Sequence, residues 1–352
     1  MTTMSTSAEP RTVEFLRTLT QLDAVPGHES EVTDFLRDRW SGFGELGGDR
    51  LGSVFCVKRG SADEPRILID SHVDEVGFVV HRVTPAGHIK FLPHRPRQDS
   101  GRDRGRPPHL LKPAERERVL DFGDLYVDVG AESHQEAVES YGVRPGCPIV
   151  PEAAFQTLAN PRLLSSKAFD NRVGVALVTE VLERIVDHPN TVIGAGCVQE
   201  EVGMRGARAV ADVVRPDVAL VLEGPYADDV PTAERSAMQC RLGGGVHVRL
   251  YDTTMVTNPR LAEFVIETAR ASGIPHQIAV WAAGGTNAGA IHQVGRGVPS
   301  IVLGVPVRYI HSHVSVMHLD DYEAALSLVL ELVAKLDRSA VERIHPRTTA
   351  RR

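Results

Sequence analysis

Aromatic residues make up only 5 % of this 352-residue chain, and no apolar run approaches the about 20 residues needed to cross a bilayer. The four cysteines lie far apart and form no Cys-x-x-Cys pair, which argues against a disulfide scaffold or a thiolate zinc site. The first ten residues lack the apolar core of a secretory signal, so we expect a frayed tail on a cytoplasmic protein. With few aromatics and a net charge of -7, neither a nucleic acid nor a membrane is expected as partner.

The rest of the composition is that of an ordinary globular protein. Apolar residues make up 42 % of the chain and charged residues 24 %, which excludes a wholly disordered chain. At about 150 residues per domain, the length predicts about two domains.

Short apolar strands alternate with amphipathic helices at the start of the chain and again from about residue 171. This alternation predicts an α/β fold, a three-layer sandwich around a largely parallel mixed sheet, formed by the discontinuous segments 1–75 and 166–352. The periodicity predicts helices at 13–22, 29–40, 172–185, 205–214, 261–271 and 320–336, and strands at 53–58, 66–72, 191–198, 217–222, 245–250, 277–280 and 299–303.

Residues 76–165 have a different character and predict a small β-rich domain inserted into the larger one. They contain no long helical pattern, but they contain strand-like fragments at 78–80, 88–91 and 124–129. The Arg-, Gly- and Pro-rich stretch 94–108 cannot build a core and is expected to be an exposed, solvated loop. Because a small β-rich domain leaves strand edges and apolar faces uncovered, we expect it to mediate self-association.

Histidines and carboxylates gather where the predicted strands end. In a parallel sheet the carboxyl ends of the strands form the site, so these residues are expected to meet in one cleft. Several carboxylates and two imidazoles so placed need a counter-charge, and mixed His/Asp/Glu sets suit zinc, cobalt or manganese. Taken singly, each has an ordinary explanation as a helix cap, a turn residue or a solvated surface group. The candidates are His72, Asp74, Asp170, Glu200, Glu201, Glu223 and His311.

Two pairs of these candidates suggest different roles for their two members. If the chain turns after residue 72, the Asp74 carboxylate can hold the second ring nitrogen of a metal-binding His72. In the pair Glu200 and Glu201, one carboxylate can bind metal while the other acts as general base on water. Gly203 and Gly206 would permit the tight turn that this needs.

Five runs in this order resemble the glutamyl-aminopeptidase and tetrahedral-aminopeptidase (TET) family of dinuclear metallopeptidases. They are His72-Val-Asp-Glu-Val-Gly77, Lys167-Ala-Phe-Asp-Asn-Arg-Val-Gly174, Glu200-Glu-Val-Gly-Met-Arg-Gly-Ala207, Gly284-Gly-Thr-Asn-Ala-Gly289 and Arg308-Tyr-Ile-His-Ser312. Each run is weak alone, whereas five in order are specific. Within the insert, Gly105-Arg-Pro-Pro-His-Leu110 and Asp124-Leu-Tyr-Val-Asp-Val-Gly-Ala131 resemble the barrel-like dimerisation domain of that family.

The resemblance implies two divalent metal ions per chain, with zinc expected first and cobalt or manganese as alternatives. Asp170 would bridge the two ions. His72 and Glu223 would complete one site, and Glu201 and His311 would complete the other. The family also implies dimers that assemble further, up to a dodecamer, and short peptides as substrates.

The same resemblance gives Glu200 the role of general base. Three positions depart from the family pattern. Glu223 stands where many relatives carry Asp, Asn287 where Asp is common, and Ser315 where Glu is frequent. Asn287 and Ser315 are not expected ligands, so they bear on substrate preference rather than on catalysis.

The function expected from these observations is metal-dependent hydrolysis of the N-terminal peptide bond of short peptides. A related amidohydrolase or deacylase acting on acylated amino acids is the nearest alternative. A glycosidase using Glu201 and Glu223 as its carboxylate pair would leave both histidines unexplained. An inactive, oligomeric metal-binding scaffold is the non-enzymatic alternative, although all six candidate catalytic and ligand positions hold competent side chains.

Overall fold

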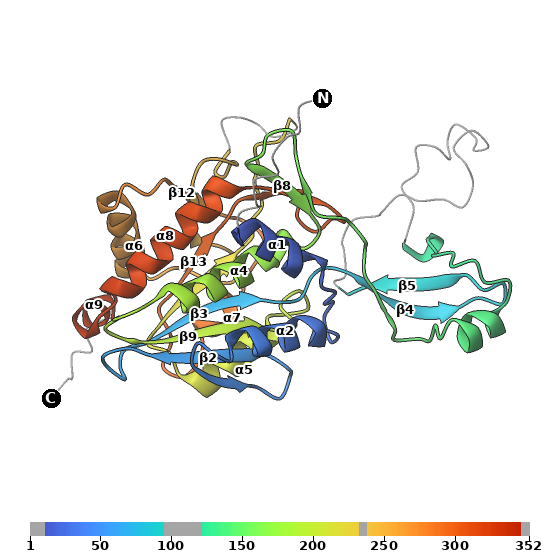
Figure 1. The fold of residues 1–352 in the computed structure, drawn as a ribbon, viewed down its shortest axis with the longest axis horizontal. Helices are drawn as coiled ribbons and strands as arrows, with labels where there is room; N and C mark the ends of the chain where they lie inside the picture. The colour runs from blue at the N-terminus through green and yellow to red at the C-terminus, as the bar shows by residue number, and fades with distance from the viewer. Residues whose placement is uncertain (1–10, 95–121, 232–237, 346–352) are drawn as a thin grey trace, which may run out of the picture. The chain divides into compact units, whose positions relative to one another are not determined.

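The computed structural model describes residues 11–94, 122–231 and 238–345 (Figure 1). The chain divides into two units. The large unit comprises Met1–Glu75 and Glu152–Arg352, and the inserted unit comprises Val76–Pro151.

An eight-stranded mixed sheet forms the centre of the described part of the large unit, in the order β1-β2-β9-β3-β10-β13-β11-β12. Four of the seven neighbouring pairs are parallel, including β9/β3 and β3/β10 in the middle of the sheet. The strands are β1 (Glu45–Gly48), β2 (Val54–Arg59), β3 (Arg66–His72), β9 (Thr191–Cys197), β10 (Val218–Glu223), β11 (Val246–Tyr251), β12 (His276–Val280) and β13 (Ser300–Gly304).

Helices cover both faces of this sheet because the central strands are apolar on both sides. In β3, Ile67 and Ile69 pack with the core that includes α1, α2, α4, α6 and α8, whereas Leu68 packs with the core that includes α5 and α7. The helices are α1 (Arg11–Gln21), α2 (Ser30–Trp40), α4 (Phe169–Arg184), α5 (Arg205–Val214), α6 (Pro259–Ala271), α7 (Ala288–Ile291), α8 (Leu319–Lys335) and α9 (Arg338–Ile344). The three-layer α/β architecture agrees with the prediction.

A second, four-stranded sheet of the large unit carries the loop that holds His311. Its order is β14-β15-β8-β7, with β7 (Gln156–Thr157), β8 (Leu163–Ser166), β14 (Val307–Arg308) and β15 (Ser315–His318). Since β7 and β8 pair with strands of the large unit, the insert ends at Pro151 and not at residue 165.

The described part of the inserted unit contains a three-stranded antiparallel sheet, β5-β4-β6, and no closed barrel. Its elements are β4 (Phe78–Val83), β5 (Ile89–Pro93), a 3-10 turn η2 (Phe122–Asp124), a π-helical turn η3 (Glu136–Ser140) and β6 (Pro148–Ile149). The strand predicted at 124–129 is wrong, because among the residues that the structure describes only Val127 of this stretch forms a bridge, with Ile89. Of the Arg-rich stretch 94–108, residues 95–108 lie outside the described residues.

The sequence pattern did not predict β1, α7 or α9, each of which is only four to seven residues long. Such short elements carry too few residues for a clear period. Within the described ranges, no helix has both the length and the apolar character needed to span a membrane.

Candidate metal centre

Three strand ends bring ligand-type residues to one edge of the central sheet. The parallel strands β9, β3 and β10 are neighbours, so their carboxyl ends lie side by side. His72 ends β3 and Glu223 ends β10, while Glu200 and Glu201 follow β9. Asp170 comes from the start of α4.

The first group of possible ligands, here called the inner triad, consists of His72, Asp170 and Glu223. One ligand atom from each lies within 4.8 Å of the others. His72 Nε2 is 3.2 Å from Asp170 Oδ1 and 3.6 Å from Glu223 Oε2. The three side chains are largely shielded from solvent, with 2 % of His72, 6 % of Glu223 and 13 % of Asp170 exposed.

The outer triad consists of Asp170, Glu201 and His311, with the same spacing limit of 4.8 Å. His311 Nε2 is 3.2 Å from Asp170 Oδ2 and 3.3 Å from Glu201 Oε1. Asp170 therefore turns one carboxylate oxygen to each histidine, which is the arrangement of a bridging ligand. Glu201 belongs to this triad and Glu200 to neither.

The backbone at Asp170 departs from the helix that it begins. Asp170 has φ -84° and ψ 102°, and Ala168 before it is in the left-handed region at φ 56°. This bend directs the Asp170 side chain toward the strand ends. The next residue, Asn171, is fully buried and donates from Nδ2 to Glu223 Oε2 at 2.9 Å and to the Leu222 carbonyl at 2.8 Å.

Asn171 thus orients a candidate ligand, a role that the sequence analysis did not foresee. Its only sequence signal is its position next to Asp170. A buried carboxamide with two acceptors and Gly174 as a donor to its Oδ1 is well satisfied.

Asp74 contacts both His72 and the segment after β9. His72 Nδ1 lies 2.9 Å from the Asp74 backbone carbonyl and 3.5 Å from its carboxylate Oδ1. The carboxylate accepts hydrogen bonds from the backbone N–H groups of Glu200, at 2.9 Å, and Glu201, at 3.0 Å. The backbone carbonyl is therefore the nearer partner of the ring, and the carboxylate chiefly fixes the Glu200–Glu201 segment.

The neighbouring carboxylates favour the protonated form of the histidine in each triad. Burial disfavours the charged form of His72, but its contacts with Asp170 and Asp74 prevail and raise its pKa well above the usual value. Burial likewise opposes charge on His311, yet Asp170 and Glu201 raise its pKa to about 10. The carboxylate of Asp170 between them has a lowered pKa, because the two histidines outweigh its burial.

Burial destabilises the ionised forms of two glutamates near these histidines, Glu200 and Glu223. Burial raises the pKa of Glu200 to about 8, opposed by His72 and assisted by Glu201. Burial also raises the pKa of Glu223 well above its usual value. The protein alone thus leaves an excess of negative charge at these strand ends, which protons or cations must balance.

The donor set fits divalent cations. Glu223 Oε1 is buried and has no hydrogen-bond partner among the described residues. An unpaired buried carboxylate oxygen is costly unless a cation or donor reaches it. Imidazole nitrogens and carboxylate oxygens are the ligands that zinc, cobalt and manganese accept.

Of the three positions that depart from the family pattern, Asn287 and Ser315 lie outside both triads. Asn287 is buried and donates to Asp70 Oδ2 at 2.9 Å, and Asp70 Oδ1 lies 2.8 Å from Cys197 Sγ. Ser315, in β15, donates to the Ser166 carbonyl at 2.9 Å. Neither side chain is a member of either triad.

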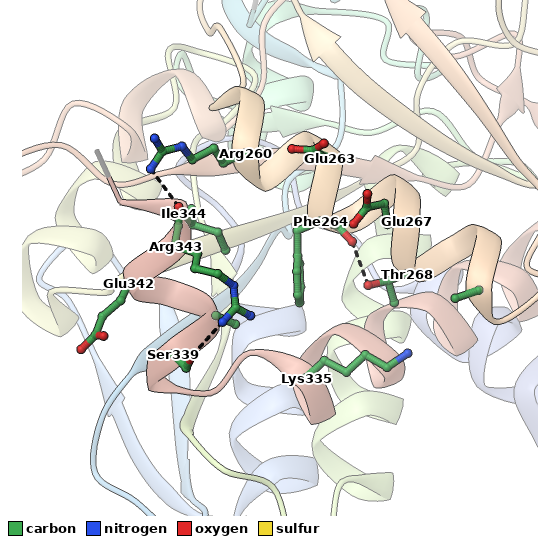
Figure 2. Close-up of a pocket in the computed structure, with 12 residues that line it drawn as sticks. Arg260, Glu263, Phe264, Glu267, Thr268, Lys335, Ser339, Glu342, Arg343 and Ile344 are labelled. Carbon is green, nitrogen blue, oxygen red and sulfur yellow. Dashed lines mark hydrogen bonds between the residues drawn. The ribbon is translucent and has the colours of Figure 1, made fainter. Parts of the chain in front are cut away.

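A separate cavity of about 1070 Å³ opens between α6, the end of α8 and α9 (Figure 2). Figure 2 shows that both basic and acidic side chains line it, such as Arg260, Glu263 and Lys335. Arg343 donates to Ser339 Oγ at 2.6 Å, and no triad residue lines the cavity. No histidine is among its lining residues, in contrast to the two triads.

Comparison with known proteins points to one family. The sequence profile described as M42 glutamyl aminopeptidase matches residues 52–93 and 101–328. Over 352 residues the chain is 32 % identical to the glutamyl aminopeptidase of Lactococcus lactis subsp. cremoris, covering 94 % of this chain and 98 % of the relative.

Solved structures agree with this. A TET aminopeptidase from a marine sediment archaeon, Thaumarchaeota archaeon SCGC AB-539-E09, superposes with a TM-score of 0.90 at 39 % identity, covering 95 % of this chain and 99 % of that one. The TET1 peptidase of Pyrococcus horikoshii, described as able to assemble into a tetrahedron or a large octahedral shell, gives 0.80 at 29 % identity and 92 % and 100 % coverage. The chain therefore belongs to the M42 glutamyl aminopeptidase family and is a peptide hydrolase.

Proposed function

We propose that this aminopeptidase hydrolyses the N-terminal peptide bond of short peptides at a pair of divalent metal ions. The observation that carries the proposal is the position of Asp170, whose two carboxylate oxygens each lie 3.2 Å from a different histidine. The donor set favours zinc, with cobalt or manganese as alternatives.

The inner triad would hold one ion and the outer triad the other. When bound, such ions polarise a scissile carbonyl and lower the pKa of water. The free amine of a peptide would be anchored at the same centre, which accounts for cleavage of the first residue only.

Glu200 is the proposed general base. It follows β9 beside the outer triad without belonging to it, and its backbone is fixed by Asp74. Glu200 would take a proton from the attacking water and deliver it to the leaving amine. A carboxylate that lies beside the metal ligands without binding an ion itself can accept and release this proton.

The oligomeric state is also a proposal. The TET1 peptidase of Pyrococcus horikoshii is described as assembling into a tetrahedron or an octahedral shell. We expect this chain to form dimers through its inserted unit and larger assemblies, up to a dodecamer, from those dimers.

The decisive experiment is an assay of the chelated and dialysed protein on a panel of aminoacyl chromogenic substrates. Activity should vanish with the metal and return with Zn, Co or Mn, with about two ions per chain by elemental analysis. Full activity of the metal-free protein would refute the proposal and leave a metal-independent carboxylate pair as the alternative. Cleavage of N-acyl amino acids in place of free aminoacyl substrates would indicate the deacylase.

A further inference from the structure

The segment that carries Glu200 is held in place by an unusual set of hydrogen bonds. Four consecutive backbone N–H groups, those of residues 198–201, donate to side chains from other parts of the chain. Val198 donates to Ser53 Oγ at 3.3 Å, while the groups of Glu200 and Glu201 donate to the two oxygens of Asp74. The fourth acceptor is Glu29, whose Oε1 lies 3.1 Å from the Gln199 nitrogen.

Glu29 is a buried residue with a fixed backbone. It immediately precedes α2, is only 5 % exposed, and its carbonyl accepts from Val32 and Thr33 in the first turn of that helix. Its Oε1 also accepts the Gly27 N–H at 2.9 Å. No ion pair to Glu29 occurs among the described residues, so backbone N–H groups, and not a cation, are its partners.

The residue that Glu29 holds has a strained conformation. Gln199 is in the left-handed region, with φ 59°, which few residues other than glycine adopt without support. The chain then turns tightly, since the Glu200 carbonyl accepts from both Gly203 and Met204 at 2.9 Å. This turn sets the direction in which the Glu200 side chain leaves the backbone.

We propose that Glu29 is a positioning residue for catalysis, which holds Gln199 in its left-handed conformation and so aims Glu200 at the metal centre. The inference rests on the proposed function of Glu200 as general base. Asp74 accepts from the N–H groups of both glutamates, and Glu29, just before α2, accepts from the N–H group of Gln199 that precedes them. Because Glu29 contacts neither triad, its loss should misdirect the base without removing a ligand.

The test compares Glu29→Ala with the conservative Glu29→Gln and with Glu31→Ala as a matched control. Glu31 lies in the first turn of α2 and is exposed, and within the described part of the chain its carboxylate accepts a hydrogen bond only from the Asp23 N–H, at 3.2 Å. Since misplacement of a catalytic group by about 1 Å can lower rates about 100-fold, Glu29→Ala should lower kcat by about 10- to 100-fold. KM and the number of bound ions should stay near wild type.

Glu29→Gln keeps an acceptor at Oε1 and should recover most of the lost kcat, whereas Glu31→Ala should behave as wild type. Hydrogen exchange gives a readout that does not depend on activity: the peptide containing residues 198–201 should exchange faster in Glu29→Ala. If that variant fails to fold, Glu29→Asp, which withdraws the carboxylate by one methylene, should show a smaller loss of kcat and faster exchange.

A double variant separates positioning from general structural damage. Because Glu29 is proposed to act through Glu200, Glu29→Ala should lower kcat little further in a Glu200→Gln background. An additive loss in the double variant, unchanged exchange at 198–201, or a fall in metal content would overturn the positioning role. If Glu200→Gln alone keeps wild-type kcat, the proposed base is wrong and the positioning role falls with it. If Glu29→Ala keeps wild-type kcat while Glu200→Gln loses it, the positioning role of Glu29 is wrong and Glu200 remains the base.

Discussion

The two triads share Asp170 but differ in how their remaining ligands are held. In the inner triad, His72 and Glu223 end neighbouring parallel strands, and Asn171 fixes Glu223 from α4. In the outer triad, His311 lies in the loop between β14 and β15, has φ 57°, and keeps 34 % of its side chain exposed, against 2 % for His72.

This difference predicts unequal metal affinity. Ligands on paired strands are already ordered, whereas a ligand on an exposed loop must be immobilised when the ion binds, at a cost in conformational entropy. We therefore expect the inner ion to bind more tightly and the outer ion to exchange first. Stepwise dialysis against a chelator, followed by elemental analysis, should show a plateau near one ion per chain.

The largest effect is expected from removing the residue that the triads share. Asp170→Ala takes one ligand from each triad and leaves each triad with one histidine and one glutamate. Both ions should be lost together, and kcat should fall by at least about 10⁴-fold. Retention of one tightly bound ion would show that the inner triad functions without a bridge. Elemental analysis after gel filtration measures this directly.

The next largest effect should come from Glu200→Gln, which leaves both triads intact. Removal of a general base lowers rates by about 10²–10⁴-fold, so kcat should fall by that factor while KM changes little. The ion content should remain that of wild type. Glu201→Gln is the matched control, since it should lose the outer ion along with activity. Reversed ion contents in the two variants would exchange their roles.

Replacing either histidine tests whether the two triads differ in metal affinity. His311→Ala should weaken the outer ion by more than about 100-fold and leave the inner ion bound, because only the loop ligand is removed. In His72→Ala the inner ion should be released first, which reverses the order in which the two ions are lost during dialysis. Isothermal titration of the metal-free variants with zinc would give both affinities. Equal losses from both sites in either variant would mean that the ions bind only as a pair.

The smallest effect is expected from Asn171→Ala, which should reduce the difference in metal affinity between the inner and the outer triad. Loss of the hydrogen bond to Glu223 Oε2 should weaken the inner ion by about 10–100-fold, the usual effect of removing a partner of a metal ligand. The free energy of unfolding should fall by about 1–3 kcal/mol, since buried acceptors lose their donor. Zinc titration and chemical denaturation measure the two effects, and an unchanged inner affinity would contradict the proposed orientation of Glu223.

Several site features were predictable because they follow from strand periodicity. His72 and Glu223 were placed at one edge of the sheet by the apolar runs that precede them, and the structure brings them together with Asp170. Residues 124–129 have the same alternating character, yet within the described residues they form only one bridge, from Val127 to Ile89 at the start of β5, because alternation alone does not ensure pairing along a strand. The extent of the insert was overestimated for a related reason, since β8 pairs with β15, which lies far along the chain.

Local periodicity and ordered motifs in the sequence were enough to predict the α/β architecture, the family and a set of candidate metal ligands. The contacts that orient these candidates could be found only in the folded structure. The bond from Glu29 to Gln199 spans 170 positions, and that from Asp74 to Glu200 spans 126. Hydrogen bonds between distant segments form only when the sheet and its helices have packed, so no local sequence pattern predicts them.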